Sequence, residues 1–493
     1  MNDVWSIDPR SGQRRIAVAS STEPAQADAV AERAHEVGAE LLDAGRSVRA
    51  EVLRRVAAQL EQRAESLVPT ADRETALGST RLTAELTRTI GQLRLLADAT
   101  AEGSYQEPVI TAPDPDAQPP VPGLRRILIP LGPVLVFGAG NFPLAFSVLG
   151  GDTAAAVAAG CPVVFKVHPG HPETSLQTVE AWRAAARETG VPADVVQVVF
   201  GDEAARRLIQ HRRIRAVSFT GSLAVGRELH DLAMSRPEPI PFYGELAGVN
   251  PFVVTKQAAR DRGADIGRGV AASFTQGAGQ FCTKPGLLFI PEGPGGDRLV
   301  EAASRHVAEL PPATMLSEGT RLNYQTGLDE LTANPQVTTV AMAGNPSEDV
   351  GGGFVAQAAL LETSVDKLDP AILRECFGPL SVVVRYQEIS DVLAVIEELD
   401  GGLAAAIHAA EDETELVATL TRAVLPKVGR VVYDGYPTGV AVSAAMTHGG
   451  PWPATTNALH SSIGPSALRR FLRPVTFQNA PAAALPADLQ DAG

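Results

Sequence analysis

The chain contains few cysteines and has no excess of positive charge. Three cysteines, Cys161, Cys282 and Cys376, occur in 493 residues, which excludes a disulfide framework and suits a reducing compartment. Asp and Glu number 57 against 42 Lys and Arg, so the net charge is -15. A surface of this sign does not grip a polyphosphate backbone. We therefore expect no nucleic-acid partner.

Long hydrophobic runs are also missing. The longest apolar region, residues 132–159, is interrupted by two prolines, an asparagine and an aspartate, which argues against a membrane span. The first ten residues hold no apolar run, so no signal peptide is expected. These absences predict a cytoplasmic protein with no membrane partner.

The composition that remains is ordinary for a globular protein, 45% hydrophobic and 20% charged, at a length that exceeds one simple core. Helical spacing runs from residue 23 to about residue 101. Residues 108–122 are proline-rich and acidic, which favours an exposed connector. We expect two or three domains.

From residue 125 to residue 234 short strands alternate with helices, including a helical pattern over residues 144–159. This alternation predicts an α/β fold with a parallel sheet wrapped on both faces, as in dinucleotide-binding domains, with ligands at the strand-to-helix corners. The second half repeats it more loosely, with a helix over residues 266–275, and predicts a second α/β domain. A terminal strand over residues 473–478 is of a kind often paired with another subunit.

The chemistry is expected in the loop 276–286, where Cys282 stands among three glycines and a proline. Such a loop lets backbone N–H groups approach a substrate bound at sulfur. A thiolate attacks carbonyl carbons and can leave again. The alternative is a buried structural cysteine in a tight turn.

A cysteine nucleophile needs an oxyanion donor and a base. Asn141, expected at the start of a helix after a strand, is a neutral amide that could donate to a developing oxyanion; it could also be an N-cap or Asx-turn residue. Glu245 lies in a stretch of apolar and small residues, where burial would raise its pKa and suit it to activate water. Otherwise it is a strand-end carboxylate with a backbone partner.

One strand-to-helix corner could hold a phosphate. Phe219, Thr220, Gly221 and Ser222, with Gly226 in the next turn, end a strand and open a helix whose free N–H groups suit an anion. A plain tight turn is the alternative.

Two charged residues could hold sugar hydroxyls. Lys166 is near a strand end, where the alternative is an exposed surface lysine. Glu375, with Phe377, precedes a Gly-Pro turn, where the alternative is a solvated loop acid. His168 and His171 have no second Cys/His pair at ligand spacing, so no metal is expected.

Together these residues resemble the aldehyde dehydrogenase superfamily over residues 74–478. Gly279-Gln-Phe-Cys282 is similar to the family's Gly-Gln-x-Cys, and Glu245-Leu-Ala-Gly248 stands where the family has Glu-Leu-Gly-Gly. The oxyanion, coenzyme and ribose motifs of the family are similar to Asn141-Phe-Pro143, Phe219-Thr-Gly-Ser222 and Glu375-x-Phe-Gly-Pro379.

This resemblance implies a fold and an assembly. It implies a Rossmann-like coenzyme domain of residues 1–109 and 131–246, and an α/β catalytic domain of residues 247–440. A small β oligomerisation element with the C-terminal tail would comprise residues 110–130 and 441–493. A homodimer or homotetramer is expected.

The resemblance also implies a mechanism. Cys282 as thiolate attacks an aldehyde carbon, and the Asn141 amide and the Cys282 backbone N–H hold the oxyanion. Hydride passes to a nicotinamide, and water activated by Glu245 hydrolyses the thioester.

The coenzyme strand departs from the common family pattern. Where the family has Lys-Pro-Ser-Glu, this chain has Lys166-Val-His-Pro. The glutamate that would repel a 2′-phosphate is absent, which favours NADP, with NAD possible. Thr174, Arg206 or Arg207 could contact the phosphate.

Segments 165–175 and 245–251, and especially segments 435–439, 448–455 and 469–475, resemble 2-oxoglutarate-semialdehyde (2,5-dioxopentanoate) dehydrogenases and related bacterial fatty-aldehyde dehydrogenases. The leading hypothesis is NAD(P)-dependent oxidation of 2-oxoglutarate semialdehyde to 2-oxoglutarate. The alternatives are a broad or long-chain aldehyde dehydrogenase and a catalytically silent nucleotide-binding homologue. An arginine facing the substrate carboxylate would favour a semialdehyde, but the sequence does not identify it.

Overall fold

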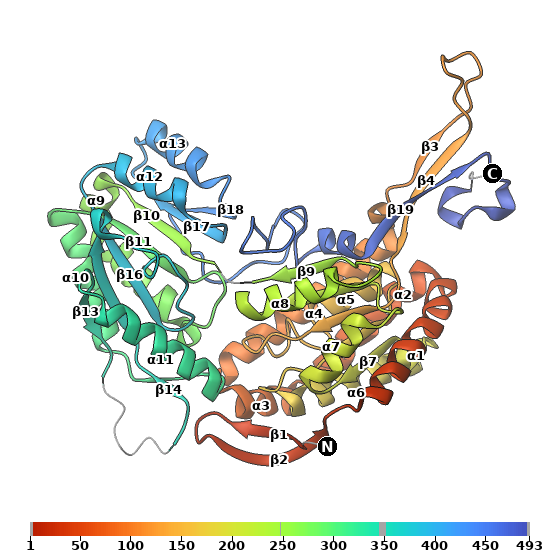
Figure 1. Ribbon diagram of the computed structural model, residues 1–493, viewed down its shortest axis with the longest axis horizontal. Helices are drawn as coiled ribbons and strands as arrows, with labels where there is room; N and C mark the ends of the chain where they lie inside the picture. The colour runs from red at the N-terminus through yellow and green to blue at the C-terminus, as the bar shows by residue number, and fades with distance from the viewer. Residues whose placement is uncertain (1–2, 247, 345–351, 491–493) are drawn as a thin grey trace.

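The computed structural model describes residues 3–246, 248–344 and 352–490. Two lobes, each a sheet covered by helices, lie side by side, and a narrow β arm leaves one of them (Figure 1). No helix among the described residues is both long and apolar enough to cross a membrane.

The first lobe is built on a parallel five-stranded sheet in the order β7-β6-β5-β8-β9. Its strands are short runs rich in valine and phenylalanine, as expected for a parallel sheet buried on both faces. They are β5 (Val134–Phe137), β6 (Val163–Lys166), β7 (Val196–Val199), β8 (Ala216–Thr220) and β9 (Phe242–Glu245). The strand order reverses next to β5, so the carboxyl ends of β5 and β8 open the crevice where α/β sheets bind ligands.

Helices cover both faces of this sheet. Side chains of α2 to α6 form the core on one face, and those of α1, α7 and α8 form it on the other. The helices are α1 (Pro24–Asp43), α2 (Gly45–Gln62), α3 (Ala64–Thr75), α4 (Ser79–Glu102), α5 (Gly151–Ala159), α6 (Pro172–Thr189), α7 (Asp202–Gln210) and α8 (Leu223–Met234). A hairpin of β1 (Asp3–Asp8) and β2 (Gln13–Ser20) precedes them.

The second lobe is built on a seven-stranded sheet in the order β13-β15-β16-β11-β10-β17-β18, in which β13 is antiparallel to β15 and the other pairs are parallel. Its strands are β10 (Asn250–Val254), β11 (Pro285–Pro291), β13 (Thr338–Met342), β15 (Ala359–Ser364), β16 (Leu380–Tyr386), β17 (Gly402–His408) and β18 (Val428–Tyr433). The short strands β12 (Ala313–Thr314) and β14 (Val355–Ala356) pair separately.

Two helical layers enclose this second sheet. Side chains of α9 (Lys256–Thr275) and α10 (Pro294–Ala308) form the core on one face. Those of α11 (Glu318–Ala333), α12 (Ile389–Glu398) and α13 (Thr414–Val424) form it on the other.

The arm is an antiparallel sheet of β3 (Val109–Thr111), β4 (Leu124–Pro130) and β19 (Leu472–Gln478), in the order β19-β4-β3. It projects away from both lobes, with the C-terminal segment beside it (Figure 1). After the second lobe the chain thus returns to the arm, where its last strand, β19, pairs with β4.

The α/β class predicted from the sequence is confirmed, but the helix expected over residues 144–159 is wrong in its first half. Residues 144–150 form turns, and α5 begins only at Gly151. The Glu85 carboxylate accepts hydrogen bonds from the backbone N–H groups of Leu144 and Ala145, at 2.8 and 2.9 Å. The backbone N–H of Gly151 donates to the Ala145 carbonyl at 2.9 Å. These bonds fold the segment back on itself in place of a helix.

The helix expected over residues 266–275 is too short. It begins at Lys256, where the hydroxyl of Thr255 accepts a hydrogen bond from the backbone N–H of Ala258 and caps the helix.

Candidate active site

Cys282 lies in a loop between α9 and β11 whose backbone favours small residues. Gly277, Ala278 and Gly279 have φ values of 57, 58 and 65°, in the left-handed region that glycine tolerates best. A Cβ on Gly279 would stand 2.2 Å from the carbonyl carbon of Gly378. The glycines therefore let the chain fold back tightly and present Cys282, which is half-buried.

Asn250, at the start of β10, holds this loop in place. Its Nδ2 donates to the carbonyls of Cys282 and Lys284, both at 2.9 Å. Its Oδ1 accepts from the backbone N–H groups of Leu403 and Ala404 at 3.1 and 3.0 Å. One fully buried amide thus ties the cysteine loop to β17. The sequence offered this residue only as part of a motif, with no sign of its role.

Asn141 faces the cysteine loop from the first lobe. Its Nδ2 donates to the carbonyl of Gln280 at 2.9 Å, two residues before Cys282. Its backbone carbonyl accepts a hydrogen bond from Nη2 of Arg81 at 2.7 Å. The turns at residues 144–150 separate Asn141 from α5, so the expectation that it begins a helix is wrong. Its amide nevertheless lies against the cysteine loop.

Glu245 ends β9 and is 5% exposed. Its Oε1 lies 2.9 Å from Nε2 of His448, which is 4% exposed, and its Oε2 accepts from the hydroxyl of Ser462 at 3.1 Å. The same Nε2 of His448 lies 3.6 Å from Sγ of Cys282. A thiol, an imidazole and a carboxylate therefore meet in one buried cluster. Of the Glu245–Gly248 motif, Ala247 lies outside the described residues.

The cluster shifts the pKa values of its acids in opposite directions. Burial would raise the pKa of Glu245, but the His448 charge, together with hydrogen bonds from His448, Cys282 and Ser462, lowers it below the ordinary value. Burial first, and then the adjacent Glu245 charge, raise the pKa of the Cys282 thiol well above its ordinary value. At neutral pH the free protein therefore holds a carboxylate beside a neutral thiol.

His448 was not selected as a site residue from the sequence, because it stands 166 positions from Cys282. Its backbone is fixed by its own N–H, which donates to Ser461 Oγ at 3.1 Å, and by its carbonyl, which accepts from the backbone N–H of Ser462 at 2.9 Å. The sequence signal that could have suggested it is a histidine directly before two glycines.

The ligand atoms of Glu245, Cys282 and His448 all lie within 4.8 Å of one another. These are the side-chain types that zinc accepts with one position open. Residue spacing in the sequence did not reveal this group, because its three members come from segments distant in the chain.

The expected coenzyme residues lie at the carboxyl edge of the first sheet. Thr220 pairs with Glu245 between β8 and β9, and the backbone N–H of Gly221 donates to the Glu245 carbonyl at 3.1 Å. Ser222 caps α8, its hydroxyl accepting from the backbone N–H of Val225. The coenzyme corner and Glu245 are therefore built on adjacent strand ends.

Close packing of side chains supports the corner formed by Phe219, Thr220, Gly221 and Ser222. The Phe219 ring meets Phe137 edge-on at 5.6 Å. A Cβ on Gly226 would stand 2.1 Å from Cδ2 of Leu246. A larger side chain at Gly226 would push α8 away from the strand end after β9.

Lys166 ends β6, and its Nζ pairs with Asp202 at 2.7 Å. The Asp202 side chain is 82% exposed, so this pairing can be exchanged for ligand hydroxyls at little cost. Arg206 pairs with Glu228, and Arg207 donates to Asp28 at 2.7 Å.

Thr174, in the first turn of α6, is turned into the core. It is fully buried in α6, and its hydroxyl and backbone N–H both donate to the Glu74 carboxylate, at 2.7 and 2.8 Å. The expectation that Thr174 contacts a coenzyme phosphate does not fit this position.

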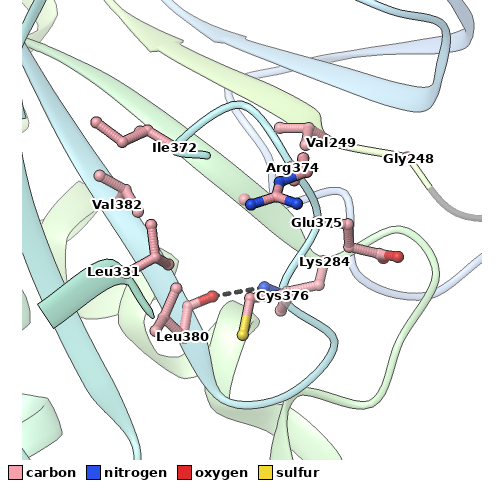
Figure 2. Close-up of a pocket in the computed structure, with 11 residues that line it drawn as sticks. Gly248, Val249, Lys284, Leu331, Ile372, Arg374, Glu375, Cys376, Leu380 and Val382 are labelled. Atoms are coloured by element: carbon pink, nitrogen blue, oxygen red, sulfur yellow. Dashed lines mark hydrogen bonds between the residues drawn. The ribbon is translucent and has the colours of Figure 1, made fainter. Parts of the chain in front are cut away.

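Glu375 belongs to the second lobe and lines a small pocket beside the cysteine loop (Figure 2). Its carboxyl group points away from Lys284, whose Nζ donates to the Leu380 carbonyl (Figure 2). Burial raises the pKa of Glu375 to about 7, and the Lys284 charge opposes that rise. Phe377 lies half-buried in the same turn.

Comparison with known proteins agrees with this geometry. The profile of the aldehyde dehydrogenase family matches residues 2–456. The alpha-ketoglutaric semialdehyde dehydrogenase of Acinetobacter baylyi is 39% identical over 94% of this chain and 89% of its own length. Alpha-ketoglutaric semialdehyde dehydrogenase 2 of Azospirillum brasilense is 40% identical over 95% of this chain and 90% of its own length.

A solved structure shares the fold. A mutant of aldehyde dehydrogenase C from Pseudomonas syringae, in complex with NAD⁺ and octanal, is similar with a TM-score of 0.81 and 19% identity, over 97% of this chain and 93% of its own. The chain belongs to the aldehyde dehydrogenase family and is an NAD(P)-dependent oxidoreductase.

Proposed function

We propose that the chain oxidises 2-oxoglutarate semialdehyde to 2-oxoglutarate, through a thioester on Cys282. The observation that carries the chemistry is the Cys282 thiol within reach of His448, itself paired with the buried Glu245. Identities of 39% and 40% to two relatives named for this semialdehyde support the substrate.

His448 Nε2 lies close to both Glu245 and Cys282, and this position indicates which group takes the thiol proton. At 2.9 Å from a carboxylate oxygen, Nε2 must carry a proton, since otherwise two lone pairs would face each other. A nitrogen that already carries a proton cannot accept another from the thiol. Glu245 is therefore the acceptor for the Cys282 proton. The Nε2–H of His448 then stabilises the thiolate 3.6 Å away.

The remaining steps follow from the same groups. The thiolate sulfur bonds to the aldehyde carbon, and the oxygen takes up negative charge. One Nδ2 hydrogen of Asn141 is engaged by Gln280, which leaves the other, with the Cys282 backbone N–H, for this oxyanion. Bound NAD(P)⁺ supplies the acceptor for the hydride that leaves the carbon. Glu245 then releases the thiol proton to solvent and, ionised again, takes a proton from the water that attacks the thioester carbon; the C–S bond breaks to release the acid and return the sulfur as thiolate.

We assign coenzyme binding to residues 1–109 and 131–246, and the nucleophile to a catalytic domain of residues 247–440. The N-terminus of α8 after Ser222 suits the coenzyme phosphates. Lys166 in the first lobe and Glu375 in the second suit the ribose hydroxyls. Phe219, Thr220, Gly221 and Gly226 shape the turn between β8 and α8. These assignments are part of the proposal.

NADP is the proposed coenzyme, with NAD as a weaker alternative. Arg206 is 43% exposed, and its partner Glu228 is 55% exposed, so a 2′-phosphate could take the place of that carboxylate. Asp202, paired with Lys166, opposes this by its negative charge. The balance between Arg206 and Asp202 therefore sets the preference.

The arm is the proposed oligomerisation element, comprising residues 110–130 and 441–493 with the neighbouring strand β3. Val109 and Ile110 of β3 are 45% and 53% exposed. An edge strand with exposed apolar side chains suits pairing with a second copy, in a homodimer or homotetramer. A reducing cytoplasm is the proposed location, because the free thiol of Cys282 must stay reduced.

A long-chain aldehyde is the second candidate substrate. Phe142 packs edge-on against Phe146 and Phe281, at 5.5 and 5.4 Å between ring centroids, and this apolar cluster beside the cysteine suits an alkyl chain. A silent homologue is disfavoured, because it would have no use for a buried acid held beside a thiol.

The test is the initial rate of reduced-coenzyme formation with 2-oxoglutarate semialdehyde, succinate semialdehyde and octanal, each with NADP and with NAD. The proposal expects the highest kcat/KM with 2-oxoglutarate semialdehyde. A preference for octanal would replace it with the second candidate. The variant Cys282→Ala is expected to bind coenzyme but give no product, and activity in it would refute the mechanism.

A further inference from the structure

The proposed substrate carries a carboxylate, and a carboxylate taken out of water needs a cation or several hydrogen-bond donors. Three arginines have guanidinium groups near the cluster. Arg81 and Arg88 come from α4, two turns apart on one face, and Arg430 comes from β18.

Arg81 is committed to the loop that carries the oxyanion donor. Its Nη2 donates to the carbonyl of Asn141 at 2.7 Å. Its guanidinium also lies over the rings of Phe142 and Phe281, at 5.0 Å from each. Removing it would loosen Asn141 and the residue before Cys282, so Arg81 is a positioning residue for any aldehyde.

Arg430 is committed to a loop of the second lobe. Its Nη1 donates to the carbonyl of Gly439 at 2.9 Å, and its Nη2 donates to the carbonyl of Pro437. Both terminal nitrogens are thus engaged by backbone.

Nη1 of Arg81 and Nη1 of Arg88 both lack a hydrogen-bond partner among the described residues, but Arg88 is not engaged by the Asn141 carbonyl. Its Nε makes one long hydrogen bond, 3.4 Å, to the carbonyl of Val440. Its Nη1 is buried and has no hydrogen-bond partner among the described residues. The guanidinium lies 5.5 Å over the ring of Phe146, which in turn stands 6.2 Å from the ring of His448. A buried donor of a charged group is therefore left unsatisfied one aromatic ring away from the catalytic cluster.

The surrounding charges do not satisfy this group. Glu85, between the two arginines on α4, is 5% exposed, and its Oε1 accepts two backbone N–H groups at 2.8 and 2.9 Å. One carboxylate therefore faces two guanidinium groups. Burial lowers the pKa of Arg88, and the charges of Glu85, Cys282 and Glu245 oppose that shift, which places the guanidinium in the field of the reacting groups.

We propose that Arg88 binds the carboxylate of the substrate through Nη1 and so selects carboxylate-bearing semialdehydes over apolar aldehydes. This inference rests on the proposed function. The methylene groups between the aldehyde and the carboxylate would lie along an apolar cluster that includes Phe142, Phe146 and Val440. Exclusion of water by these side chains strengthens the ion pair.

The test compares Arg88→Met with wild type on two substrates of equal carbon number, 2-oxoglutarate semialdehyde and pentanal, and on succinate semialdehyde. Arg88→Met should lose about 100-fold in kcat/KM on both semialdehydes, mostly through KM, because a buried carboxylate loses its partner. Pentanal should change by less than about threefold, since it makes no such contact. Arg88→Lys should recover part of the loss through its point charge.

Two further variants separate selection from structure. Arg94→Met changes an exposed arginine on the same helix, paired with Glu61, and should behave as wild type on every substrate. Arg81→Met should slow pentanal and the semialdehydes alike, because it acts through Asn141. Melting temperatures of all variants report on folding.

The outcomes distinguish the inference from the function on which it rests. Equal loss on pentanal and the semialdehydes in Arg88→Met, or no loss on either, overturns the role of Arg88. A wild-type preference for succinate semialdehyde overturns the proposed substrate but leaves the Arg88 comparison valid on that acid. A wild-type preference for pentanal over both semialdehydes overturns both.

Discussion

Replacing His448 with phenylalanine removes the donor that holds Glu245 ionised. The hydrogen bond from Nε2 to Oε1 is 2.9 Å long and buried, and a hydrogen bond to a charged group contributes about 1.5–3 kcal/mol. At 1.36 kcal/mol for each pKa unit, its loss should raise the pKa of Glu245 by about 1–2 units. Burial, which already acts to raise that pKa, would then be opposed by the hydrogen bonds from Cys282 and Ser462.

The assay is the pH dependence of kcat/KM. Because Glu245 must be ionised to take the thiol proton, activity is lost as pH falls through its pKa. The acidic limb of the profile should therefore move to higher pH by about 1–2 units in His448→Phe. His35→Phe, on an exposed position of α1, should leave the profile unchanged. An acidic limb at the same pH in His448→Phe and wild type would refute the proton assignment.

The further predictions concern the surrounding groups. Glu375→Gln should raise the free energy of unfolding at pH 8 by up to about 3 kcal/mol. The carboxyl pKa is about 7 in the folded protein and 4.5 in the unfolded chain, so folding disfavours the charged form above pH 7 and has no such cost below pH 4. Melting temperatures of the variant and wild type at pH 8 and pH 4 check this. The same variant should weaken coenzyme binding about tenfold, measured by fluorescence titration, because a neutral amide is a poorer acceptor for ribose hydroxyls. Asn250→Ala leaves four buried backbone groups without a partner and should cost about 3 kcal/mol or more in urea unfolding; a loss under about 1 kcal/mol would contradict its anchoring role. Asp202→Asn should raise the NADP-to-NAD ratio of kcat/KM by about 3–10-fold, by removing a charge that repels a 2′-phosphate, and an unchanged ratio would place the phosphate elsewhere. Zinc should inhibit reversibly through the cluster that includes His448, with EDTA restoring activity and His448→Phe reducing sensitivity about tenfold or more.

The alternation of strands and helices in the first lobe was predictable, because strands such as β5, β6 and β7 are short runs rich in valine and the helices have apolar residues at helical spacing. The helix predicted to open after Ser222 is α8, which begins at Leu223. The turns at residues 144–150 were not predictable, since the bonds that form them come from Glu85, far away on α4. Strand β17 was also missed, because its run of three alanines has low strand propensity and is stabilised by its neighbours in the sheet.

In the site, too, residues with a local sequence signal were predictable and residues that depend on long-range packing were not. Cys282 and Glu245 were recognisable from local composition and family motif, and the structure brings both into one cluster. His448 and Arg88 were not selected, because each depends on packing between segments distant in sequence. Thr174 was proposed as a phosphate contact where the chain departs from the family's coenzyme motif, and the sequence could not show that Glu74, on another helix, engages its hydroxyl.

The central claim is that Cys282 carries the acyl group and Glu245 releases it. The most direct measurement is a rapid acid quench of Glu245→Gln mixed with 2-oxoglutarate semialdehyde and NADP at pH 9, followed by peptide mass spectrometry; at that pH solvent takes the thiol proton, because the variant lacks the carboxylate charge that raises the pKa of Cys282. The account predicts that the peptide containing Cys282 carries the mass of the acyl group, together with about one equivalent of reduced coenzyme per site. An unmodified Cys282 peptide alongside full turnover, or an acyl group on Cys376, would contradict it.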